Sequence, residues 1–162
     1  MGVVSDSSPL ILLSAIGELN LLQSLYSIIN VPDAVYEEIT AAGAGLPGAQ
    51  EISDAGWIHR HKVRNKRAVT KLMKATGLDR GESEAIILAQ ELGASLLIVD
   101  DGTARRYAKK KGMPITGAIG VLLAAKNNGL IQAVKPLLGE LIAAGIWLDA
   151  ETYQNALKIA GE

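Results

Sequence analysis

The stretch from Asp79 to Asp101 constrains the fold of this chain more than any other. Carboxylates open it, a long apolar run follows as far as Gly93, and a second apolar run ends in two aspartates. This pattern predicts a helix, a glycine turn and a buried strand. A short turn makes the helix and the strand antiparallel, so their acidic ends would lie on the same side of the fold. Carboxylates gathered in this way usually hold hard divalent metal ions.

Short apolar strands alternate with helices along the remaining sequence. Further strands are predicted at residues 3–5, 28–31, 57–63 and 115–116. This alternation predicts an α/β protein, built as a three-layer α/β/α sandwich around a mostly parallel sheet of four to five strands. The length of 162 residues is expected to form a single domain over residues 1–162. A glycine-rich segment at residues 43–48 is expected to be the most flexible part.

The composition excludes several classes of protein. It is 49% hydrophobic and 20% charged, which is typical of a globular chain. The absence of cysteine rules out disulfides, thiolate metal sites and thiol nucleophiles. The formal net charge of -1 gives no global attraction to nucleic acid, although local patches remain open. Without a signal-peptide pattern or a long apolar span, the expected location is cytoplasmic, away from any membrane.

Aspartates follow two of the predicted strands. Asp6 comes directly after residues 3–5, and Asp100 and Asp101 come directly after the strand that ends the acidic stretch. In parallel α/β sheets, ligands bind outside the carboxyl ends of the strands, which makes this a candidate site. Asp6 could instead cap the helix that begins near Ser7. One aspartate of the pair could cap the next helix, and the other would then need a partner such as a metal ion.

Two glutamates at the start of the long helix compete for a place in this site. Glu82 stands three residues after Asp79, which is the spacing of a capping box, so it could serve the helix terminus alone. Glu84 could be a solvated acid that is favoured by the helix dipole. The sequence leaves open which of the two carboxylates points towards the site.

Basic residues form two groups on either side of the acidic stretch, at residues 60–74 and 105–111. On ordinary helices such groups are solvated faces. Because they flank a proposed carboxylate site, they could also follow the phosphates of a nucleic acid, which supply much of its affinity for proteins. The residues expected to make these contacts are Lys62, Arg64, Lys66, Arg67, Arg105 and Arg106.

In their order and spacing, four motifs resemble those of the PIN-domain family of metal-dependent ribonucleases, and most of all its VapC-like branch of prokaryotic toxin–antitoxin modules. The motifs are residues 3–11, 31–39, 78–86 and 97–101. The resemblance places the acids of the first three motifs at Asp6, Glu38 and Glu82. The family more often has Asp at the third of these positions, and Thr or Ser where this chain has Val99.

The resemblance implies a ribonuclease that hydrolyses phosphodiester bonds with Mg²⁺ or Mn²⁺. Its catalytic and metal-binding residues would be Asp6, Glu38, Glu82, Asp100 and Asp101, with Glu84 as a further candidate metal ligand. It also implies RNA as the substrate, a small antitoxin as a partner, and a homodimer. The dimer face could include the apolar residues 10–13 and 121–125, although core packing explains them equally well.

Two other functions are open at this stage. A degenerate PIN domain would bind RNA or a protein partner without cleavage. A different Mg²⁺-dependent phosphate enzyme on a similar sheet is disfavoured, because Asp6-Ser7-Ser8 lacks the second aspartate of an Asp-x-Asp motif.

Overall fold

Five parallel strands form the sheet of this protein, in the order β3-β2-β1-β4-β5. The computed structural model describes residues 2–41 and 48–162. The strands are β1 (Val3–Ser5), β2 (Ile29–Pro32), β3 (Ile58–His61), β4 (Leu96–Ile98) and β5 (Ile115–Thr116). The predicted sheet is confirmed, and all five of these strands are parallel. Of the glycine-rich segment at 43–48, only Gly48 lies within the described residues.

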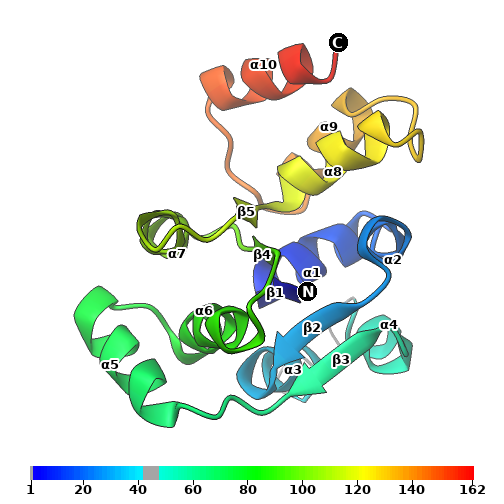
Figure 1. The fold of residues 1–162 in the computed structure, drawn as a ribbon. Helices are drawn as coiled ribbons and strands as arrows, with labels where there is room; N and C mark the ends of the chain where they lie inside the picture. Colours follow the sequence, from blue (N-terminus) through cyan, green and yellow to red (C-terminus); the bar gives the residue numbers. More distant parts are fainter. Residues whose placement is uncertain (1, 42–47) are drawn as a thin grey trace.

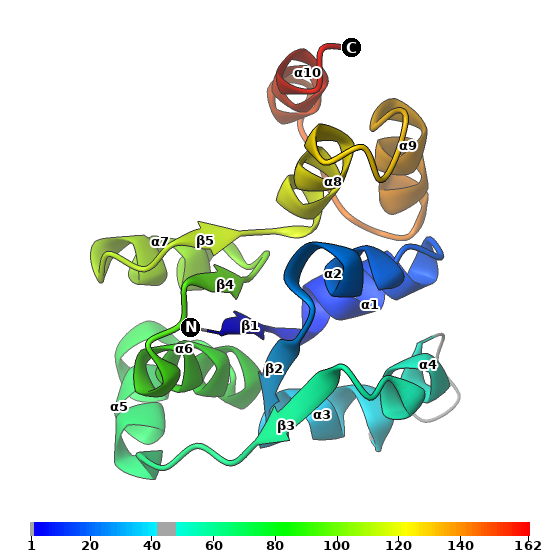
Figure 2. The same cartoon turned by 45° about the vertical axis from the view of Figure 1, so that its right-hand side comes forward.

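Helices cover both faces of the sheet, which confirms the three-layer sandwich (Figures 1 and 2). One face carries α5 (Lys66–Thr76), α6 (Arg80–Leu92) and α7 (Gly102–Lys110). The core on the other face includes α1 (Ser7–Ala15), α2 (Asn20–Tyr26), α3 (Asp33–Thr40), α4 (Ala49–Asp54), α8 (Ala118–Asn127), α9 (Lys135–Ala143) and α10 (Ala150–Ile159). Neighbouring residues of β1 serve the two faces, since Val3 packs into one core and Val4 into the other.

Strand β1 is the centre of the sheet and the point at which the chain changes direction. The chain runs outward from β1 to β2 and β3, and then returns to the other side of β1 for β4 and β5. Ser5 lies opposite Ile98, and the backbone N–H of Asp6 donates to the carbonyl of Ile98 at 2.9 Å. The residues that follow β1 and β4 therefore leave the sheet side by side. Ligands of open parallel sheets bind in the crevice at such a switch point.

Helix α6 is buried along most of its length, and its N-terminus lies at this same edge of the sheet. A capping box of Asp79 and Glu82 begins it, and Gly93, with a left-handed φ of 58°, ends it. Strand β4 then runs back antiparallel to the helix, as the sequence pattern predicts. As a result, Asp79, Glu82 and Asp101 line a common depression.

The C-terminal helices complete the hydrophobic core on one face of the sheet. The side chains of Leu10, Leu13, Val121, Leu122 and Ala125 are fully buried, so core packing accounts for these members of the two apolar segments. Ile11 is exposed, and the dimer face stays a prediction. The carboxylate of Glu162 accepts hydrogen bonds from the backbone N–H groups of Val134 and Lys135 at 2.7 and 3.0 Å and from Lys126 Nζ at 2.9 Å. The end of the chain is thus fastened to the start of α9. Among the described residues, no helix combines the length and apolar character needed to cross a membrane.

Candidate metal centre

Asp6 is a carboxylate at the end of β1 with almost no access to water. It occupies the N-cap position of α1 without a side-chain capping hydrogen bond, and it is 2% exposed. Its Oδ1 atom has no hydrogen-bond partner among the described residues. Burial raises the pKa of Asp6 to about 7, the backbone N–H of Ser7 opposes this rise, and the negative charges of Glu82, Asp79 and Glu38 add to it. Helix capping therefore does not explain the Asp6 carboxylate.

Glu82 takes part in both of the arrangements that its sequence position allows. Asp79 Oδ1 accepts the Glu82 N–H at 2.8 Å, and Glu82 Oε2 accepts the Asp79 N–H at 3.1 Å. The capping box occupies one carboxylate oxygen of Glu82. Partial burial raises the pKa of Glu82; the Asp79 N–H opposes this shift, and the negative charges of Asp79, Asp101 and Glu38 reinforce it. Glu82 is both a helix cap and a member of an acidic cluster.

Glu38 reaches this cluster from α3 because Gly81 makes room for it. A Cβ atom at Gly81 would lie 3.1 Å from Glu38 Oε2 and 3.6 Å from Asp79 Oδ1. Helices α3 and α6 pack against each other, with the first turn of α6 beside the carboxylate of Glu38. The second and third sequence motifs thus meet at a glycine.

The two aspartates after β4 point to different partners. Asp101 caps α7, since its Oδ2 accepts the Ala104 N–H at 2.9 Å, and it is exposed beside Glu82. Asp100 turns towards α8, where its Oδ1 accepts the Ala118 N–H at 2.9 Å and its buried Oδ2 has no partner among the described residues. Burial raises the pKa of Asp100, whereas the Ala118 N–H and the charge of Arg105 oppose the rise. Asp101 is therefore the aspartate that caps the next helix, and Asp100 is the one with a carboxylate oxygen that lacks a partner among the described residues.

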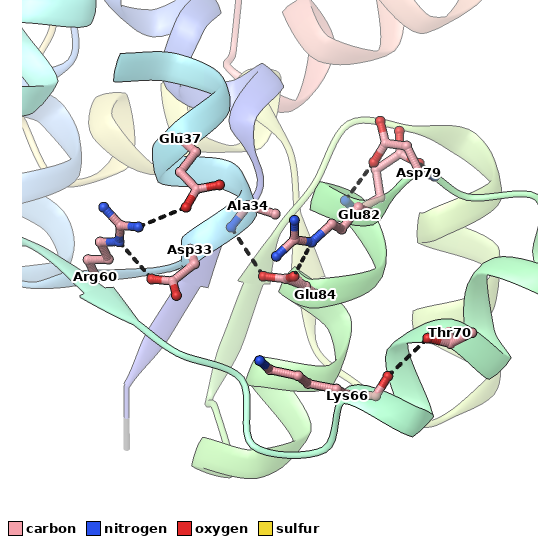
Figure 3. A network of polar contacts seen from close by, with 10 residues as sticks. Asp33, Ala34, Glu37, Arg60, Lys66, Thr70, Asp79, Glu82 and Glu84 are labelled. Carbon is pink, nitrogen blue, oxygen red and sulfur yellow. Dashed lines mark hydrogen bonds and ion pairs between the residues drawn. The ribbon is translucent and has the colours of Figure 1, made fainter. Parts of the chain in front are cut away.

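Glu84 belongs to a polar network that also contains Ala34 and Arg80 (Figure 3). Its Oε1 accepts the Ala34 N–H at 3.1 Å, and its Oε2 accepts from Arg80 Nε at 2.7 Å. Oε1 therefore joins α6 to the start of α3, and Oε2 forms an i,i+4 ion pair within α6. Both Glu84 oxygens already have partners, and a metal-binding role for Glu84 stays a prediction.

The remaining carboxylates fit a hydrated divalent ion, although they do not form a closed cage. Within residues 2–41 and 48–162, no group of three or more acidic or histidine side chains is arranged to enclose a metal ion. Their charges act on one another across longer distances than direct coordination requires. Mg²⁺ usually keeps several waters and takes only one or two carboxylates from the protein. The unpartnered oxygens of Asp6 and Asp100 supply hard ligands that a cation or its water would satisfy.

The basic residues near α5 leave a cationic surface beside the polar network of Glu84. Lys62 and Lys66 line a depression of about 250 Å³ next to Arg80. Neither lysine forms an ion pair with any part of the chain that the structure describes. Arg64 and Arg67 are also exposed. These four predicted nucleic-acid contacts remain accessible to a phosphate.

Other arginines are held by the protein itself. Arg105 is half-buried and donates through Nη1 to the Val99 carbonyl at 2.9 Å, and its predicted contact with nucleic acid stays a prediction. Arg106 is exposed and donates to Thr103 Oγ1 at 3.1 Å. Arg60 pairs with Asp33 at 2.6 Å and with Glu37 at 3.0 Å, as Figure 3 shows. The sequence gives their charge, and only the fold shows which guanidinium groups are engaged.

Trp147 lies beside the acidic cluster and was not expected from the sequence. It belongs to the loop between α9 and α10, and it is 81% exposed. It lines a depression together with Glu82, Asp100 and Asp101. No motif or spacing marks this residue, because the loop reaches the site only through the packing of α9 on α1.

The fold and its site define a class of protein: a parallel α/β/α sandwich that gathers carboxylates at the switch point of its sheet. A family model described as a PIN domain matches residues 2–162. The chain belongs to the PIN-domain family, whose members are generally nucleases and typically use divalent metals. A comparison with curated proteins finds no match. The VapC-like branch stays a prediction.

Proposed function

We propose that this protein is a metal-dependent endoribonuclease that hydrolyses phosphodiester bonds in RNA with Mg²⁺ or Mn²⁺. The observation that carries the proposal is Asp6. This buried carboxylate has an unpartnered oxygen, and its pKa is raised to about 7 beside three other acids. A group with these properties at the switch point of a sheet is more typical of a functional site than of a structural one.

The carboxylates have different roles in this proposal. Asp6 and Asp100 would hold the ion through the oxygens that lack partners, while Glu38, Glu82 and Asp101 would bind it directly or through its waters. When bound, such an ion activates water and offsets the negative charge on the phosphate oxygens. The Oε1 atom of Glu82 lies outside the capping box, so it can accept the proton that the attacking water loses.

The proposed reaction is the hydrolysis of a phosphodiester bond. The water oxygen forms a new bond to phosphorus, one P–O ester bond of the RNA breaks, and the departing oxygen takes up a proton. The exposed cations Lys62, Lys66, Arg64 and Arg67, with Arg106 on α7, would hold neighbouring phosphates in place.

Cleavage of a generic single-stranded RNA in Mn²⁺ tests this function. We expect Asp6→Asn to lower the cleavage rate about a hundredfold or more, since even the partners of metal ligands cost 10- to 100-fold when removed. The matched control is Asp54→Asn, an exposed acid that accepts a hydrogen bond from Gln50, and it should cleave like the wild type. Equal cleavage by Asp6→Asn and the wild type would remove the proposal.

A second candidate is a PIN domain that binds RNA or a protein without cleaving RNA. It is favoured by the absence of a preformed acidic cage among the described residues and by the capping duties of Glu82 and Asp101. Purified wild-type protein that binds RNA in Mn²⁺ and gives no products would support this reading.

The toxin role, the small antitoxin, the homodimer and the cytoplasmic location are proposals that rest on the family resemblance. Growth arrest on expression, relieved by a small protein encoded next to this chain, tests the first two. Light scattering across a concentration series tests the dimer.

A further inference from the structure

A depression of about 400 Å³ beside the acidic cluster is lined by two kinds of residue. Glu82, Asp100 and Asp101 are the acidic ones. The other lining residues are largely apolar: Ser8, Ile11, Leu12, Gly145, Ile146 and Trp147. Its volume lies within the usual range for sites that bind small organic groups. The proposed metal site gives a role to the carboxylates and none to the apolar residues around Trp147.

Trp147 is displayed to solvent by a loop that is fixed to α9. The Gly145 N–H donates to the Ile142 carbonyl at 3.1 Å, and the Ile146 N–H donates to the Leu141 carbonyl at 3.1 Å. Gly145 has a φ of 114°, which a side chain would strain. Two residues after Trp147, Asp149 caps α10. Both ends of the loop are therefore anchored, while the indole itself is 81% exposed.

This exposure sets Trp147 apart from the other tryptophan of the chain. Trp57 is partly buried and packs against the core. Aromatic side chains contribute most when they are covered, so one held open next to a proposed phosphate site is available to stack against a ligand with a flat face.

We propose that Trp147 is the stacking platform of a subsite for an unpaired nucleobase next to the phosphate that is cleaved. This inference rests on the proposed ribonuclease function, because a phosphate at the carboxylates would carry its attached nucleoside along the same depression. A nucleobase stacks on an indole through its face and needs no particular sequence. A base inside a duplex has no free face, so the subsite selects single-stranded RNA.

A nucleobase fits this depression better than a protein segment does. An apolar helix or strand pressed onto Trp147 would also cover Glu82, Asp100 and Asp101, and removing those charges from water without partners is costly. A base attached to the RNA backbone reaches the indole and leaves the carboxylates with the ion and its waters.

The test is the affinity of a short fluorescein-labelled single-stranded RNA, measured by anisotropy in Ca²⁺ and again in EDTA. We expect Trp147→Ala to weaken binding about five- to hundredfold, the range for loss of one stacked base. Trp147→Phe should retain most of the affinity. The control Ile159→Ala removes another exposed apolar side chain, 73% exposed on α10, and should bind like the wild type.

Two further nucleic-acid ligands distinguish stacking on Trp147 from other causes of weaker binding. An RNA with abasic positions should bind weakly to the wild type and lose little more with Trp147→Ala, and a duplex should show no dependence on Trp147. RNA should also quench a part of the tryptophan fluorescence that is missing in Trp147→Phe. Unchanged affinity of Trp147→Ala, or equal losses for abasic and normal RNA, would overturn the proposal. So would a blue shift of Trp147 emission with protein concentration alone, which would indicate a second copy on this surface.

The subsite and the nuclease function can fail separately. Binding that depends on Trp147 without any cleavage in Mn²⁺ would reject the ribonuclease and keep the base subsite. Cleavage that depends on Asp6 while Trp147→Ala binds and cleaves normally would do the reverse. No RNA binding by the wild type would reject both.

Discussion

The Asp6 carboxylate is almost completely buried, and this affects the stability of the metal-free protein. Its pKa is raised from 3.8 to about 7 on folding, chiefly by burial. The folded chain therefore holds a proton between these values that the unfolded chain has released. Stability is unaffected by this group below pH 4 and is lost as the pH rises towards 7. The buried negative charge of Asp6 lowers the stability of the metal-free protein, and a bound cation would offset this cost.

We predict that Asp6→Asn stabilises the metal-free protein at pH 8, by on the order of 2–4 kcal/mol from the size of the pKa shift. The difference from the wild type should shrink below pH 5 and vanish near pH 4. Urea unfolding in EDTA between pH 4 and pH 8 measures it. Mg²⁺ should stabilise the wild type more than the variant at pH 8. A variant that is less stable at every pH would contradict this account of Asp6.

At the scale of elements, helix α6 connects the site to its support. The first turn of the helix holds Glu82 at the acidic cluster. Two residues later, Glu84 connects the helix to the start of α3. The closeness of these two helices depends on Gly81, which lies against the carboxylate of Glu38. The position of Glu38 is therefore set by how closely α3 and α6 can approach.

We predict that Gly81→Ala separates stability from activity. The new methyl group displaces the flexible Glu38 carboxylate, and cleavage should fall about tenfold or more. Alanine favours a helix by about 0.5–1 kcal/mol over glycine, so the free energy of unfolding should stay level or rise. The matched control is Gly139→Ala on α9, where no atom of the described residues lies within 4 Å of the added one. Full activity in Gly81→Ala would mean that the place of Glu38 is unimportant.

The elements and the approximate place of the site follow from local patterns, whereas the division of labour within the site does not. Hydrophobic runs, the capping spacing at Asp79 and the acids after β1 and β4 are all visible in the sequence. Asp100 and Asp101 follow the same strand, so their roles depend on the distant N–H group of Ala118 and on the local one of Ala104. The engagement of Glu84 and the exposure of Trp147 likewise arise from contacts between remote segments.

At the scale of the whole molecule, the last residue secures the C-terminal helices. Glu162 bridges the start of α9 and Lys126 of α8. Hydrogen bonds from the Val134 N–H, from Lys126 and from the Lys135 N–H lower the pKa of Glu162 to about 2. A lowered carboxyl pKa stabilises the folded state above the ordinary value of 4.5, and this contribution is lost as the pH falls towards 2.

We predict that Glu162→Ala loosens α9 and α10 and leaves the sheet intact. Amide hydrogen exchange in these two helices should become faster at neutral pH, and the difference from the wild type should disappear as the pH approaches 2. Glu151→Ala, which removes an exposed acid from the first turn of α10, should exchange like the wild type. Uniform exchange changes across the sheet would indicate general destabilisation instead.

The central place of β1 also sets when the site can come into being during synthesis. Asp6 is synthesised well before its neighbours across the switch point, which follow β4 far along the chain. Until β4 pairs with β1, a nascent chain carries the acid without its partners. The carboxylate cluster cannot assemble before β4 has been synthesised, so shorter nascent chains would lack any activity that depends on it.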